Sequence, residues 1–170
     1  MRDIKSIHTV QLLHPKIRDE VKALIEKAES FFPASIAIRI VQGLRTIDEQ
    51  NKLYAQGRTA PGKIVTKAKG GQSYHNFGLA IDFALLHDKD GNGTYETLSW
   101  DDKEDYDKDG TIDWREVVDV FEKAGYTWGG RWATIVDAPH LEKTFGHHWS
   151  DLLKLYNEKK FIPGTQYVNI

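Results

Sequence analysis

The chain has 170 residues, 40% of them hydrophobic, which is enough for one compact domain with a single core. Its formal net charge of −2 gives no sign of a nucleic-acid or anionic-membrane partner. Cysteine is absent, which excludes disulfides, thiolate nucleophiles and cysteine metal ligands, so any metal must be held by histidine or oxygen.

Hydrophobic patterning predicts helices and strands in mixed order along the chain. Helices are expected where apolar residues recur every three or four positions, and strands where apolar and β-branched residues alternate. In chain order, these patterns predict a helix over 15–31, a strand over 35–46 that ends near Gly43, a helix from Thr46 to Gly57 with Glu49 completing a capping box, a loop over 58–72, a strand over 79–85, a helix over 114–124, turn and strand segments over 128–132 and 135–142, and a helix over 147–159. This mixture favours a single α+β domain, 1–170, with a small antiparallel sheet flanked by helices.

The strand over 79–85 carries a lone aspartate inside an apolar run. With the two-residue period of a strand, its odd-numbered apolar residues share one face, and Asp82 lies on the other. A carboxylate in such a place must be hydrogen-bonded, paired with a cation or bound to a metal.

Two histidines and one carboxylate suit a catalytic zinc site. His75 precedes Asp82 by seven residues, and a later DAPH segment supplies Asp137 and His140. Zinc takes nitrogen and oxygen ligands tetrahedrally, and three protein ligands leave the fourth position to water. Asp137 could take the proton from that water. Spacing alone leaves open that these histidines are ordinary surface residues or hydrogen-bonded core residues.

An acidic insert over 87–116 differs from the rest of the chain. Its second half, DYDKDGTIDWRE, matches a twelve-residue calcium loop at every position. The expected ligands are Asp105, Asp107, Asp109, Thr111 through its carbonyl, Asp113 and Glu116. Alternatively, Asp113 and Glu116 form a capping pair for the helix that follows, but only calcium explains the first three aspartates.

The first half of the insert, DKDGNGTYETLS, begins in the same way. A second calcium site is therefore considered, with ligands at Asp88, Asp90, Asn92 and Thr94, and with Glu96 nearby. Its twelfth position is Ser99, which cannot chelate bidentately, although Asp101 or Asp102 could substitute. The alternative is a solvated turn.

The order of these motifs resembles that of a known peptidase family. SYHNFGLAID, at 73–82, is similar to the S-x-H-x-x-G-x-A-x-D signature of the zinc peptidases that include D-alanyl-D-alanine carboxypeptidases and L-alanyl-D-glutamate endopeptidases, among them bacterial wall-remodelling enzymes and phage endolysins. The likeness continues through LRTIDEQNKLYAQGRTAPGKIVTKAKGG, WGGRW and DAPHLE, so it spans most of residues 40–142. It implies the fold shared by hedgehog and D-Ala-D-Ala peptidases, and a peptidoglycan stem peptide as substrate.

The resemblance also implies roles for individual residues: zinc ligands at His75, Asp82 and His140, a general base at Asp137, and a substrate-contacting arginine at Arg45. Amide hydrolysis would follow, with the base passing a proton from water to the leaving amine. Ser73, Trp128 and Trp132 are further candidates for the cleft. Their alternatives are a plain turn residue and core tryptophans, and the alternative for Arg45 is a surface salt bridge.

The chain also departs from the family pattern in two places. Leu141 follows the late histidine where an aromatic residue is common, and Arg131 follows WGG where an acidic residue is common. Neither position is a proposed ligand, so these departures bear on substrate choice.

The predicted function is a zinc-dependent peptidoglycan peptidase, and the match through LYAQGRTAPGKIVTKAKGG favours an L-alanyl-D-glutamate endopeptidase. A D-alanyl-D-alanine carboxypeptidase or dipeptidase would use the same zinc site. A non-catalytic wall-binding module would keep the fold and metals but would be expected to lose Asp137. A calcium-signalling protein would be expected to have paired helix-loop-helix units, which are missing here.

The substrate of such an enzyme lies outside the cytoplasmic membrane, whereas the first residues lack the long apolar stretch of a secretory signal. There is also no apolar run long enough to span a bilayer. The expectation is a monomer that acts in the cell wall or periplasm, after phage-type release or removal of a leader, without nucleic-acid or membrane partners.

Overall fold

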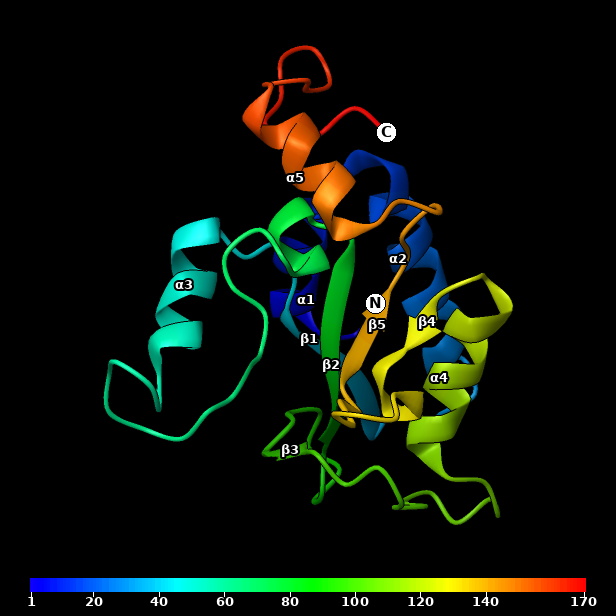
Figure 1. Cartoon of the computed structure of the whole chain (residues 1–170). Helices are drawn as coiled ribbons and strands as arrows, with labels where there is room; N and C mark the ends of the chain where they lie inside the picture. The colour runs from blue at the N-terminus through cyan, green and yellow to red at the C-terminus, as the bar shows by residue number, and fades with distance from the viewer.

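The strand that carries the lone aspartate, β2 (Ala80–His87), lies at the centre of a five-stranded antiparallel sheet in the computed structural model, which describes residues 1–170 (Figure 1). The other strands are β1 (Ile36–Gln42), β3 (Thr97–Ser99), β4 (Thr127–Trp128) and β5 (His140–Glu142). One edge of β2 pairs with β1, and the other edge is shared. There, β5 pairs with the first residues of β2 and β3 with the last, while β4 adds to β5.

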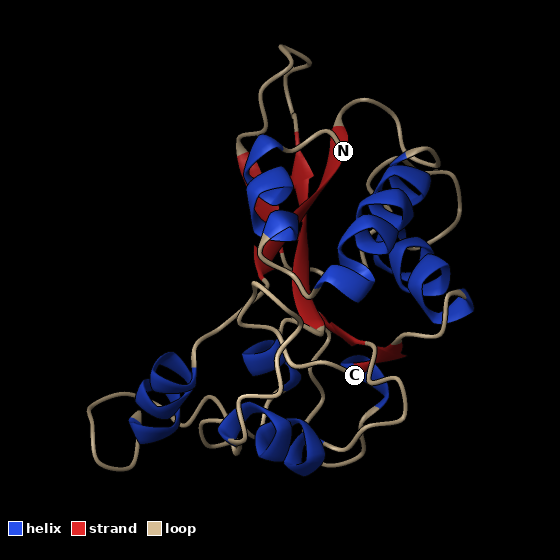
Figure 2. Cartoon of the chain, turned by 90° about the horizontal axis from the view of Figure 1, so that it is seen from above, coloured by secondary structure: helices blue, strands red, loops and turns tan.

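Five α-helices surround this sheet, on both sides of the strands (Figure 2). They are α1 (Ile4–Gln11), α2 (Pro15–Glu29), α3 (Ile47–Ala55), α4 (Asp113–Lys123) and α5 (Trp149–Asn157), with two short 3₁₀ helices, η1 (Tyr74–Phe77) and η2 (Gly129–Arg131). Helices α2 and α4 pack against each other. In Figure 1, α3 projects to one side of β2, and α5 and β3 lie at opposite ends of the sheet.

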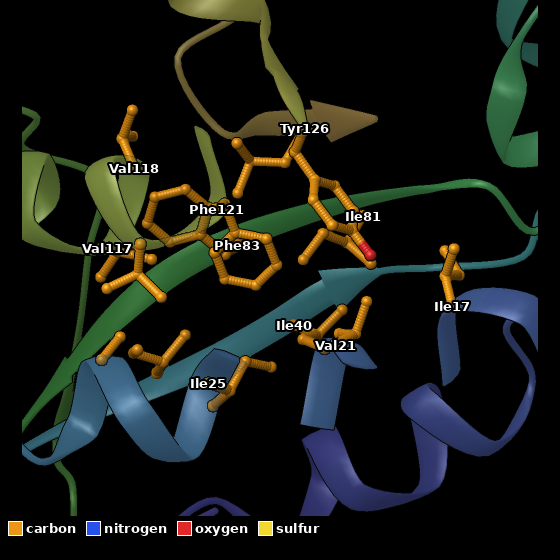
Figure 3. Close-up of a cluster of buried hydrophobic side chains, with 14 of the residues drawn as sticks. Ile17, Val21, Ile25, Ile40, Ile81, Phe83, Val117, Val118, Phe121 and Tyr126 are labelled. Atoms are coloured by element: carbon orange, nitrogen blue, oxygen red, sulfur yellow. The ribbon is translucent and has the colours of Figure 1, made fainter. Parts of the chain in front are cut away.

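The hydrophobic core lies between the sheet and the pair α2 and α4 (Figure 3). From β2, Ile81 and Phe83 point into it and are almost fully buried. The Phe83 ring lies 4.4 Å from the ring of Trp114, at the start of α4. Because a slip of one residue would turn this apolar set out of the core, burial fixes the register of β2. The same register holds Asp82 on the opposite face.

None of these helices is both long enough and apolar enough to cross a membrane.

The structure confirms the predicted α+β class, and each predicted helix lies within two residues of the expected ends. Two elements were not predicted. Helix α1 has only eight residues, and its Ile4 is 71% exposed instead of buried. It lies along the free edge of β1, where the backbone N–H of Ile40 donates to the Ser6 hydroxyl at 2.7 Å. Strand β3 has only three residues and lies inside the acidic insert, where no alternation marks it.

Candidate metal centre

Three side chains from separate segments converge where β2 meets β5. Asp82 and His140 are directly opposite each other in the ladder, and His75 comes from η1. The Oδ1 atom of Asp82 lies 3.1 Å from His75 Nε2 and 3.1 Å from His140 Nδ1, and the two nitrogens are 3.2 Å apart. Ligand atoms about 2.1 Å from one tetrahedral zinc ion would lie roughly 3.4 Å apart. The triangle therefore has close to the dimensions that zinc requires.

The turn after η1 directs His75 toward β2. Gly78 ends η1 with a φ of 68°, a left-handed conformation that glycine adopts without strain. A Cβ at this position would also lie 2.8 Å from the backbone nitrogen of His14. The glycine of the SYHNFGLAID motif is thus required both by backbone conformation and by close packing.

Each histidine of the triangle has its second ring nitrogen occupied by an acceptor. His75 Nδ1 donates to the carbonyl oxygen of Gly43 at 2.8 Å, and His140 Nε2 donates to Glu142 Oε2 at 2.8 Å. Carbonyl and carboxylate oxygens only accept hydrogen bonds, so they place the ring protons on those nitrogens. His75 Nε2 and His140 Nδ1, which face Asp82 and each other, are then the nitrogens whose lone pairs a metal ion can take.

The electrostatics of the triangle also favour a cation. Burial disfavours the charged form of Asp82, but the neighbouring His75 and the hydrogen bonds from both histidines outweigh burial and lower the pKa of this carboxyl. Burial likewise lowers the pKa of His140, but hydrogen bonds to Asp82 and Glu142 raise it to about 9. The ionised carboxylate of Asp82 is thus stabilised by positive charge, which a proton on His140 supplies in the absence of a metal and which a bound cation can supply instead.

Arg45 lies beside the triangle, in the loop between β1 and α3. Its Nη2 atom is 3.7 Å from Asp82 Oδ2, and its side chain is only 14% exposed. Its Nη1 donates to Gln50 Oε1 at 2.9 Å, while its Nε is buried without a partner. Burial lowers the pKa of Arg45 against the opposing effect of Asp82. This residue is therefore a cation of the site, and the surface salt bridge considered from sequence is not what the structure shows.

Asp137 lies in the same cleft as the triangle. Its backbone N–H donates to the carbonyl of Gly129 at 3.1 Å, and a Cβ on Gly129 would come within 2.6 Å of the Asp137 carbonyl oxygen. The first glycine of WGGRW thus lets the DAPH segment approach closely. Burial, followed by the charge of Asp82, raises the pKa of the Asp137 carboxyl, which makes it a better proton acceptor.

The cleft around the triangle has a volume of about 600 Å³. The segment Val65–Tyr74 and the segment Trp132–Asp137 both contribute to its lining, and Ser73 lies in it as predicted. The structure places Trp128 elsewhere: it is 8% exposed, and its Nε1 donates to the carbonyl of Ala138 at 2.7 Å. Trp132 lines the cleft instead, with its ring 5.0 Å from that of His140.

Sequence reasoning missed Glu142, which lines the cleft and contacts His140. A signal was present, because residues two apart on a strand share a face. It could be used only once β5 was known to begin at His140.

The acidic insert forms two clusters at the far end of β2. In each cluster, three carboxylates have oxygens within 4.8 Å of one another: Asp105, Asp107 and Asp109 in one, and Asp88, Asp90 and Glu96 in the other. In the first loop, the exposed Asn92 and Thr94 hydrogen-bond to this trio: the Asn92 amide donates to Asp90 Oδ2 at 2.9 Å, and the Thr94 hydroxyl donates to Glu96 Oε1 at 2.9 Å. The carboxylates of Asp113 and Glu116 lie outside the second trio.

Asp113 and Glu116 nevertheless lie in an unusual environment beside the second trio. Asp113 is fully buried and accepts a hydrogen bond from Tyr106 N at 3.1 Å, but its Oδ1 and the Oε2 of Glu116 are buried without partners. Burial and the neighbouring carboxylates raise the pKa of Asp113 to about 6 and that of Glu116 to about 7. No side chain caps α4, which begins at Asp113, so the capping alternative is not realised.

Comparisons with known proteins agree with this geometry. Residues 66–143 match a peptidase family described as D-alanyl-D-alanine carboxypeptidase. Over 130 residues, the chain is 45% identical to the peptidoglycan L-alanyl-D-glutamate endopeptidase CwlK of Bacillus subtilis, covering 76% of this chain and 72% of that protein. The solved structure of the L-Ala D-Glu endopeptidase ChiX of Serratia marcescens is similar in fold, with a TM-score of 0.52 and 21% identity over 84% of this chain and 88% of that one.

Proposed function

Because the chain belongs to the zinc peptidase family of D-alanyl-D-alanine carboxypeptidases and L-alanyl-D-glutamate endopeptidases, we propose that it hydrolyses the amide bond between L-alanine and D-glutamate in the peptidoglycan stem peptide. The observation that carries the proposal is the triangle of His75, Asp82 and His140, which shares one cleft with Asp137 and Arg45. The choice of bond is supported by the 45% identity with CwlK. The place of action is accordingly the cell wall, where this substrate occurs.

The catalytic roles follow from the chemistry of the cleft. When bound by the three ligands, zinc supplies Lewis acidity, which polarises the scissile carbonyl and lowers the pKa of water toward ~7. Asp137 accepts the proton of the attacking water and later delivers it to the leaving amine. Its raised pKa suits both halves of this task, because it holds the proton more readily than an ordinary aspartate.

Arg45 acts on the substrate. Its guanidinium is fixed by Gln50 and faces the cleft beside Asp82, so it presents remaining N–H groups in a rigid fork. That fork suits a substrate carboxylate or the oxyanion that develops at the scissile carbonyl.

The test is digestion of purified muropeptides by the zinc-loaded protein, with identification of the new chain ends. We expect D-glutamate to appear as the new amino terminus. Replacing the base, Asp137→Asn, should lower kcat by about 10²- to 10⁴-fold while zinc content stays at the wild-type level. The matched control is Asp119→Asn, which removes an exposed carboxylate of α4 and should change neither quantity. Near-normal cleavage by the Asp137 variant would contradict this role.

A second candidate function is removal of the terminal D-alanine, which the description of the matched family favours. The same ligands, base and arginine would serve that reaction. The digestion separates the two functions, because a carboxypeptidase releases free D-alanine and creates no new amino terminus. Release of D-alanine alone would replace the endopeptidase proposal.

We also propose that the acidic insert binds calcium, with one ion in the loop Asp105–Glu116 and a second around Asp88, Asp90 and Glu96. The first site is supported by the complete loop motif and by the buried, unpartnered oxygens of Asp113 and Glu116. An ion would supply the missing partner for both. For the second site, the support is the carboxylate trio alone.

A calcium ion in the loop over 105–116 would act close to the catalytic segment. Its ligands Asp113 and Glu116 belong to the first turn of α4, as does Trp114, whose Nε1 donates to the carbonyl of Ala138 at 3.2 Å. Ala138 directly follows the base. Ordering of this turn by calcium would therefore hold the base-bearing segment in place.

A further inference from the structure

His140 is enclosed by polar partners on both sides of its ring. Its Nδ1 faces Asp82 and His75, and its Nε2 donates to Glu142 Oε2 at 2.8 Å. The two side chains of this second contact are only 6% and 12% exposed. Because His140 and Glu142 are two residues apart on β5, they share a face of the strand. The contact is therefore built into the sheet.

We propose that Glu142 is a positioning residue, which holds His140 in the orientation and tautomer needed for metal binding. A carboxylate only accepts hydrogen bonds, so it keeps the ring proton on Nε2 and leaves the Nδ1 lone pair facing Asp82. A carboxylate behind a ligating histidine also makes the imidazole a stronger ligand. This inference rests on the proposed function for the identity of the metal, but on the hydrogen bond itself for the role.

The other histidine of the triangle shows why Glu142 matters. His75 is oriented by the backbone carbonyl of Gly43, which no substitution removes. The orientation of His140 depends instead on one side chain. Without Glu142, no protein acceptor remains at Nε2, and the ring is free to turn that nitrogen toward the other ligands. Loss of Glu142 should therefore weaken the metal site as a whole.

Glu142 also lines the cleft, so contact with substrate is the rival role. The two roles separate in a measurement made without substrate. Zinc affinity, determined by competition with a chromophoric chelator, depends on the ligands and on the residues that position them, and not on contacts with substrate. The absorption spectrum of the cobalt-substituted protein reports the geometry of the same set.

The experiment compares Glu142→Ala, Glu142→Gln and wild type, with thermal unfolding as the check on folding. We expect the alanine variant to bind zinc about 10- to 100-fold more weakly and to show an altered cobalt spectrum. Glutamine keeps an acceptor oxygen and should restore part of the affinity. The matched control is Glu20→Gln. Glu20 pairs with Lys143, the residue that follows Glu142, at 2.7 Å, so this variant also removes a glutamate charge beside β5 but does not contact His140.

Unchanged zinc affinity and spectrum in a folded alanine variant would overturn the proposal, and a raised KM in that variant would assign Glu142 to the substrate instead. If the alanine variant fails to fold, the glutamine variant decides, because loss of charge alone should still weaken zinc binding relative to wild type and the control. Failure of the proposed function looks different: the wild type would bind zinc and respond to these substitutions, yet leave muropeptides uncut.

Discussion

A single hydrogen bond gives Arg45 its place in the cleft, since Gln50 fixes one end of its guanidinium and leaves the rest directed toward Asp82. The backbone N–H of Arg45 also donates to the carbonyl of His75 at 3.0 Å. The arginine of the cleft and the first proposed metal ligand are therefore joined through the backbone. Substitution of the side chain leaves that backbone bond intact, so the role of the guanidinium can be isolated.

We predict that Arg45→Lys lowers kcat/KM by about 10²- to 10³-fold without changing zinc content. Lysine keeps the charge but loses the planar fork, and a lost oxyanion donor has an effect of this size. Steady-state kinetics on a defined stem peptide, with metal analysis of the same samples, measure both. Arg18→Lys is the control, because Arg18 contacts the Leu13 carbonyl away from the cleft. Wild-type kinetics in the Arg45 variant would remove it from the mechanism.

At this scale the sequence singled out five residues that the structure brings into one cleft, His75, Asp82, His140, Asp137 and Arg45, because their residue types and spacing match a family motif. Their hydrogen-bonding partners could not be named. Gly43 and Glu142 act through a backbone carbonyl and through strand register, and neither leaves a distinctive residue pattern. The assignment of Trp128 to the cleft failed for the same reason, since two nearby tryptophans look alike until the turn between them is known.

The first turn of α4 is the element that connects the acidic insert to the catalytic segment. The helix was predicted to within one residue, because its apolar period is strong. Its link to Ala138 was not predictable, since the indole of Trp114 reaches across to residues 24 positions later. Local pattern fixes where a helix lies in the chain, whereas tertiary packing decides what its first turn touches.

We predict that Asp107→Asn weakens calcium binding at the second loop without altering zinc content. Asp107 belongs to the carboxylate trio, and its loss removes a charged ligand. Calorimetric titration with calcium measures the change directly. Asp119→Asn removes the same charge from an exposed position of α4 outside both carboxylate clusters, so it should bind calcium as the wild type does. Equal affinity in all three proteins would contradict the proposed ligand set.

On the scale of the whole molecule, β2 connects the two proposed metal-binding regions, the His75, Asp82 and His140 triangle and the acidic insert. Asp82 lies near the start of β2, where this strand pairs with β5. The acidic insert begins at the other end of β2, which pairs with β3. The α+β class followed from the mixed order of patterns, but the shared edge of β2 could not be foreseen, because three-residue strands carry little pattern. Stability of the sheet and charge in the insert are thereby coupled.

This coupling predicts a pH-dependent effect of calcium on stability. The pKa values of Asp113 and Glu116 in the folded protein, about 6 and about 7, exceed the value of about 4 expected in the unfolded chain. Between pH 4 and 7 the folded state binds more protons, so without calcium the free energy of unfolding should fall as pH rises through this window. Calcium favours the ionised carboxylates, so it should raise Tm more at pH 8 than at pH 5.

Thermal unfolding at both pH values, with calcium and with a calcium chelator that spares zinc, measures this difference. An equal rise of Tm at the two pH values would show that these carboxylates do not take part. The double replacement of Asp113 and Glu116 by their amides should abolish the pH dependence.

The carbonyl of Ala138 receives two indole N–H groups, from Trp114 at 3.2 Å and from Trp128 at 2.7 Å. Two of the five tryptophans of the chain are thus anchored to the residue that follows the base, and Trp132 lies against His140. Indole emission responds to hydrogen bonding and to nearby charge. The intrinsic fluorescence of a single sample is therefore expected to report both proposed events, calcium binding in the acidic loop and the arrival of a ligand in the cleft.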